Sequence, residues 1–169
     1  MRNFRSVLAQ SIAIIAALVV TATTAAPAMA SGHSLLREHF VGVIPLNQPG
    51  ASPIIAGVSP GGAPWVLDAD SHVRLREDGR ITVVVNHLVI PGRVPPNLPN
   101  PVATMAASLV CGDVVVDSTR PFAVSPDGNG SISDRIGEFD EDDCDNPTVL
   151  VRNATGPTLG AYFAVAMDD

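Results

Sequence analysis

Residues 72–85 read HVRLREDGRITVVV, and this stretch decides the fold class. Val73 and Leu75 alternate with arginines, which is the period of two that a strand shows when one of its faces is buried. Asp78 and Gly79 follow as a dipeptide that is typical of a tight hairpin turn, and the apolar alternation then resumes. The stretch therefore predicts an antiparallel β-hairpin.

Outward from this hairpin, short apolar or alternating stretches are separated by turn residues, which predicts an all-β fold. We expect an antiparallel β-sandwich, Ig-like or similar. The expected strands cover residues 54–58, 65–68, 72–76, 80–90, 102–110, 114–117, 121–124, 131–136, 148–152 and 159–167. Residues 83–85 and 114–116 are apolar at every position, so we expect those strands to be central, or to present one face to a partner.

The first 30 residues have the order of a cleavable secretory signal. Arg2 and Arg5 precede an apolar run at 12–20, and a small-x-small pattern ends at Ala30, where we expect cleavage. The run is too short to span a bilayer, and no later stretch reaches spanning length, so no transmembrane segment is expected after cleavage. An uncleaved N-terminal anchor is the alternative. Residues 31–53 then form a flexible, Pro-containing lead-in that begins with a helix-compatible piece at 34–40, and residues 54–169 form a single β domain.

Every basic residue of the chain is an arginine, and acidic residues outnumber them by 17 to 10. Without the first 30 residues the balance is 8 basic to 17 acidic, a net charge of −9. This balance excludes a basic nucleic-acid binder and argues against docking to anionic lipid by charge alone.

Two cysteines, Cys111 and Cys144, are predicted to form a disulfide, because export would place them in an oxidising compartment. The competing interpretation is a reactive or metal-binding thiol pair. Neither cysteine has a CxxC partner or a histidine nearby in sequence, so the structural bridge is favoured.

An acidic run at 138–145 is the most distinctive composition in the chain. Carboxylates concentrated in one loop suit calcium, with Asp140, Glu141, Asp142 and Asp143 as candidate ligands. A solvated acidic loop without a bound ion is favoured over this interpretation, so no cofactor is expected and calcium is the alternative.

Two further patterns suggest chemistry. Residues 57–61 read GVSPG, the G-x-S-x-G spelling of a hydrolase elbow around Ser59, although the prolines and glycines that follow deny it the helix that such a site needs. His72 and His87 could meet Asp68 and Asp70 at a metal if their strands paired, but ordinary strand-end histidines are favoured.

The chain resembles a group of small secreted proteins of high-GC actinobacteria, which are largely uncharacterised. The resemblance covers most of residues 63–166 and depends on the segments APWVL at 63–67, RITV at 80–83, AASLVCG at 106–112, CDNPTVLVR at 144–152 and YFAV at 162–165. It implies an exported β domain with one disulfide and brings no activity with it.

We therefore expect a secreted, extracellular, non-enzymatic β-sandwich module with an interaction or structural role. Its partner is not identified by the sequence, and the candidates are a cell-wall component or a protein. A calcium- or metal-binding module using residues 138–145 is the first alternative, and a small secreted hydrolase using Ser59 is the second.

Overall fold

The predicted hairpin is present and forms the centre of one sheet. In the computed structural model, β3 (His72–Arg76) pairs antiparallel with β4 (Arg80–Val85), with Val73 opposite Val83 and Leu75 opposite Ile81. These four apolar side chains are buried, while Arg74 and Arg80 are exposed. The turn is closed by a hydrogen bond from the Gly79 amide to the Arg76 carbonyl (2.9 Å).

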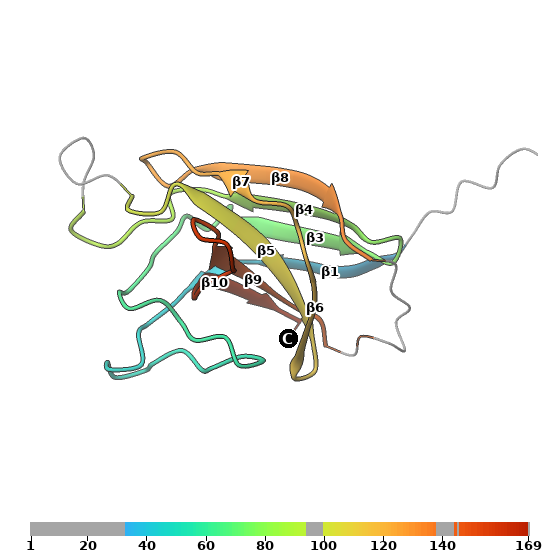
Figure 1. Ribbon diagram of the computed structural model, residues 1–169, viewed down its shortest axis with the longest axis horizontal. Coiled ribbons are helices and arrows are strands. Elements are labelled where there is room, and N and C mark those ends of the chain that lie inside the picture. Colours follow the sequence, from blue (N-terminus) through green and yellow to red (C-terminus); the bar gives the residue numbers. More distant parts are fainter. Residues whose placement is uncertain (1–32, 94–99, 138–143, 145, 169) are drawn as a thin grey trace, which may run out of the picture. The chain divides into compact units, whose positions relative to one another are not determined.

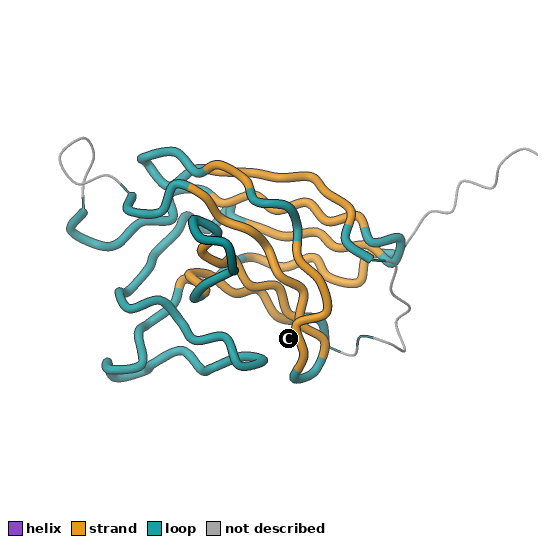
Figure 2. Tube along the Cα trace, viewed as in Figure 1, coloured by secondary structure: helices purple, strands orange, loops and turns teal. Residues whose placement is uncertain are grey.

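Two antiparallel sheets pack against each other, which confirms the all-β sandwich (Figure 1). The structure describes residues 33–93, 100–137, 144 and 146–168. Within those residues no segment is helical (Figure 2). Sheet A has the strand order β1-β3-β4-β8, and sheet B has the order β2-β10-β9-β5-β6, with β7 also paired to β5. The remaining strands are β1 (Ser34–His39), β2 (Val41–Gly42), β5 (Thr104–Cys111), β6 (Val114–Ser118), β7 (Phe122–Ala123), β8 (Gly130–Arg135), β9 (Thr148–Asn153) and β10 (Tyr162–Met167).

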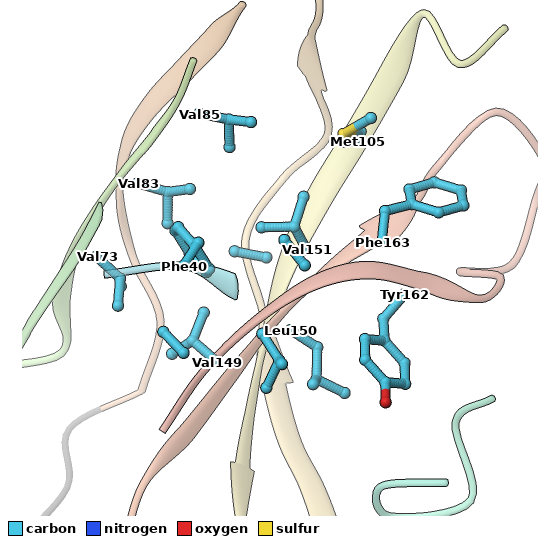
Figure 3. Packing of buried hydrophobic residues seen from close by; sticks show 14 of the residues in the cluster. Phe40, Val73, Val83, Val85, Met105, Val149, Leu150, Val151, Tyr162 and Phe163 are labelled. Carbon is cyan, nitrogen blue, oxygen red and sulfur yellow. The ribbon is translucent and has the colours of Figure 1, made fainter. Parts of the chain in front are cut away.

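The core lies between the two sheets. Val73, Val83 and Val85 from sheet A lie toward Met105 and Val151 from sheet B, and all five are fully buried (Figure 3). Burial of apolar surface stabilises a fold by roughly 25 cal/mol for each Å² removed from water. The large apolar side chains between the two sheets are therefore the main source of stability.

The two sheets differ in how their outer faces are covered. In sheet B the outward-facing Leu150, Ser108 and Val110 are also buried. The Arg152 side chain lies over this face and donates hydrogen bonds to the carbonyls of Gly160 (2.9 Å) and Leu159 (2.8 Å) in the loop before β10. None of the described residues covers the arginines of sheet A in this way, so the outer face of its central strands is open in the described part of the chain.

The expectation of a flexible lead-in over residues 31–53 is wrong for β1 and β2, and so is the helix-compatible piece at 34–40. Residues 34–39 form the edge strand of sheet A, paired with β3, and residues 41–42 pair with β10 in sheet B. Leu36 and Phe40 are buried in the core. The local sequence suits a helix, but pairing with a strand more than 30 residues away overrides that preference, as tertiary packing commonly does.

Three other expected strands are shorter or absent. Residues 54–58 and 65–68 make only isolated bridges, Ile55 with Val58 and Val66 with Val89. The strand expected over 80–90 ends at Val85, because His87 takes a left-handed backbone conformation (φ 54°) that no strand contains. Residues 114–116 are not central either, since β6 is the edge strand of sheet B and Val114 is 61% exposed.

The disulfide between Cys111 and Cys144 is present, with a Cα–Cα distance of 4.9 Å. Cys111 is the last residue of β5, and Cys144 lies four residues before β9, the strand that pairs with β5. Cys144 is 3% exposed. The bridge therefore holds the chain that enters β9 against the end of β5.

Removing this disulfide should destabilise the protein. Closing a loop of 33 residues contributes roughly 3 to 4 kcal/mol in the chain-entropy model. The paired variant Cys111→Ala and Cys144→Ala should therefore melt lower by about 10 to 15 °C, measured by thermal unfolding under circular dichroism. Reductant should lower the melting temperature of the wild type and leave that of the variant unchanged. An unchanged wild-type melting temperature would contradict a stabilising bridge.

The turn of the central hairpin should tolerate no side chain at Gly79. Gly79 has φ 76°, and a Cβ there would lie 1.6 Å from the Gly137 carbonyl oxygen. Gly112 also has a positive φ (59°) but has open space around it, which makes it a matched control. Gly112→Ala should cost about 1 kcal/mol for the backbone conformation alone. Gly79→Ala should cost clearly more in chemical denaturation, and equal costs would show that the turn relaxes freely.

Candidate functional site

The candidate calcium ligands and the expected cleavage residue fall on parts of the sequence that the structure does not describe. Asp140, Glu141, Asp142 and Asp143 lie outside the described residues, and so does Ala30. Among the residues that are described, no group of three or more His, Cys, Asp or Glu side chains could hold a metal ion. The calcium site at 138–145 therefore stays a prediction.

Ser59 is exposed between the buried Val58 and Pro60, in a stretch that runs beside β10 rather than in an elbow. Its carbonyl accepts a hydrogen bond from the Tyr162 amide (3.1 Å), and the next residue, Pro60, bridges to the same strand. No helix follows, and in the described part of the chain no histidine contacts its hydroxyl by a hydrogen bond. Ser59 therefore lies in a loop that is hydrogen-bonded to β10, and its surroundings are not those of a nucleophile elbow.

The histidines pair differently from the metal-site hypothesis. His72 lies opposite Val84 in the hairpin, not opposite His87, whose backbone amide donates to the Asn129 side chain (2.8 Å). On its other side His72 lies directly opposite His39 of β1. The His72 Nδ1 atom is 2.7 Å from the Asp70 carbonyl oxygen. Because a carbonyl oxygen only accepts, Nδ1–H is the donor, and Nε2 lies on the side of the ring away from Asp70.

The outer face of sheet A carries most of the arginines that follow residue 30. We call this surface the basic face and define it by the outward residues Arg37, His39, His72, Arg74, Arg76, Arg80 and Arg135. It holds five of the eight arginines that follow residue 30, in a protein with an acid excess. A hollow of about 500 Å³ on this face is lined by four of these arginines, and a smaller one of about 220 Å³ is lined by Arg37, the two histidines and the acidic Glu38.

Like charges lie directly opposite each other on the basic face. Arg37 is the register partner of Arg74, and Arg80 is the register partner of Arg135. Cross-strand pairs of equal charge destabilise a sheet, whereas opposite charges stabilise it. Packing and folding stability therefore do not account for this arrangement.

Acidic groups compensate only part of this charge. Arg80 Nε lies 3.4 Å from Asp78 Oδ2, and the Asp134 carboxylate beside the larger hollow is engaged by the backbone amides of Arg120 and Arg135 (2.9 Å each). Within the described residues, Arg37, Arg74 and Arg76 have no hydrogen-bond acceptor or carboxylate partner for their guanidinium groups.

These arginines were not among the predicted site residues, although the sequence carries a signal for two of them. Arg74 and Arg76 occupy the polar positions of the alternation that predicts β3, which places both on one solvated face. Arg37 could not be assigned to the same face, because β1 was expected to be a lead-in. The net charge of the chain is also negative, because acidic residues elsewhere outnumber the arginines of this face, so it gives no sign of a local basic surface.

No known protein family, curated protein or solved structure matches this chain. In the described part of the chain, no helix has the length and apolar character that crossing a membrane requires. The candidate site therefore rests on the geometry alone.

Replacing Arg74 should stabilise the fold. Arg74→Gln removes the repulsion with Arg37, and Arg74→Glu converts it into a cross-strand ion pair, so stability should rise from Arg to Gln to Glu by a few tenths to about 1 kcal/mol in total. Urea unfolding at low salt measures the change, and added salt should reduce it. A loss of stability in both variants would show that Arg74 serves the fold.

Proposed function

We propose that this chain is a secreted, non-enzymatic β-sandwich module that binds an anionic ligand on the basic face of sheet A. The observation that carries the proposal is the set of like-charged cross-strand pairs, Arg37 with Arg74 and Arg80 with Arg135, on an open sheet face. An anion placed over such pairs removes their repulsion and accepts their hydrogen bonds.

The chemistry of the side chains supports an oxyanion. The guanidinium fork matches carboxylate and phosphate groups with two parallel hydrogen bonds. Thr82 and Ser133 line the same hollow as the arginines, and their hydroxyl oxygens lie 3.4 Å apart. Hydroxyl groups beside cations provide additional hydrogen bonds for a polar ligand.

The disulfide supports the extracellular part of the proposal, because such bonds persist mainly in oxidising compartments. A cell-wall component with carboxylate or phosphate groups is a ligand of this kind. The binding face needs no acid, base or nucleophile, which is why a binding module is proposed rather than a hydrolase.

The purified protein should be retained on immobilised heparin in low-salt buffer, despite its sequence pI of about 4.8. A uniformly acidic surface would be repelled by this sulfated polymer, so retention reports a local basic site. The double variant Arg74→Glu and Arg80→Glu should pass through the column without retention.

Arg93→Glu is the control for a charge reversal outside the hollows of the basic face, and it is compared with the single variant Arg74→Glu, which makes the same change in net charge. Because Arg93 is partly buried, circular dichroism first checks that this variant folds. Arg93→Glu should elute close to the wild type. Passage of the wild type through the column, or equal elution of all variants that fold, would refute an anion-binding face.

A further inference from the structure

We infer that the ligand is an extended linear polyanion that crosses the strands of sheet A, rather than a single small anion; this inference rests on the proposed function. The charged residues do not converge on one point. They follow a diagonal band over the sheet: His39 and His72 at one end, Arg37 and Arg74 next, then Arg76, and Arg80 and Arg135 at the other end.

The size of the band exceeds a single phosphate or carboxylate. The band crosses all four strands of sheet A and extends along β3 from His72 to Arg76, which is four steps of rise. Strand spacing and rise together give a length of about 20 Å. The two hollows are neighbours along the band, because Arg37 lines one, Arg74 lines the other, and these two residues are register partners.

The exposure of the arginines points the same way. Arg37, Arg74 and Arg80 are exposed, and an isolated ion pair at an exposed site contributes only about 0 to 1 kcal/mol. Several such contacts on one connected chain act together, because each later contact forms within the same complex. A face of this type therefore binds a polymer tightly and a monomer weakly.

The absence of aromatic side chains from the band favours a saccharide, polyol or phosphate polymer over a nucleic acid. None of the described residues on the basic face is Phe, Tyr or Trp, and Trp65, Tyr162 and Phe163 are buried. Single-stranded nucleic acids are usually held by stacking of bases on aromatic rings. Ser131 and Ser133 on β8 instead border the band with hydroxyl groups.

The test uses inorganic polyphosphate chains of increasing length as the probe, with orthophosphate as the monomer. Fluorescence anisotropy with a labelled long chain gives the dissociation constant, and the other phosphates compete. At equal phosphate concentration, affinity should rise at least 100-fold between orthophosphate and a chain that spans about 20 Å. The logarithm of the binding constant should fall with the logarithm of salt with a slope of about −3 to −4, as for five contacts to a flexible strand.

Two variants from separate parts of the band provide the matched comparison. Arg37→Ala and Arg80→Ala should each weaken binding of the long chain and reduce the steepness of the salt dependence by about 0.7, whereas Arg93→Ala should change neither. Oligothymidylate of equal charge should bind no more tightly than polyphosphate.

Three results would overturn the inference: competition by orthophosphate within tenfold of the long chain, a salt dependence unaffected by Arg37→Ala, or tighter binding of oligothymidylate. Retention on heparin together with the first result would leave the anion-binding function in place and remove only the polymeric ligand. Failure of heparin retention would remove both.

Discussion

The alternation of side chains along β3 and β4 is the constraint on which the rest of the structure depends. Val73 and Leu75 must enter the core for the two sheets to pack, and a strand sends its neighbouring residues to the opposite face. Burial of these two apolar side chains therefore places Arg74 and Arg76 on the solvent side. The core and the basic face are two consequences of one register, and a shift of one residue would exchange them.

This coupling explains how a protein can maintain a cluster of like charges. The repulsion between opposed arginines amounts to tenths of a kilocalorie to about 1 kcal/mol per pair, whereas burial of each Val or Leu contributes about 1.5 to 3 kcal/mol. The apolar term is larger, so the sheet keeps its register with the arginines in place. This cost applies most directly to Arg37 and Arg74, whose guanidinium groups have no carboxylate partner within the described residues, and the proposed anion would relieve it.

The sequence predicts the fold wherever the information is local. The hairpin at Gly79 and strands β5 to β10, to within a few residues, follow from alternation and turn chemistry. The pairing of Cys111 with Cys144 was predicted because the chain has only these two cysteines. The strand β1 does not follow, because residues 34–39 suit a helix and become a strand only by pairing with β3. The end of β4 is similarly set by the backbone of His87, whose amide bonds to Asn129 on a distant turn.

The candidate site was harder to predict than the fold for the same reason. The arginines of β3 could be placed on one face from the sequence, but the opposition of Arg37 to Arg74 and of Arg80 to Arg135 depends on pairings between distant segments. The two sheets also differ in burial. Sheet B is buried on both faces of its central strands and holds the disulfide, while the described residues bury only the inner face of sheet A. Because the disulfide and the doubly buried strands lie in sheet B, charge changes on the outer face of sheet A remove nothing from the core. A loss of binding in such variants therefore reports on the ligand contact itself.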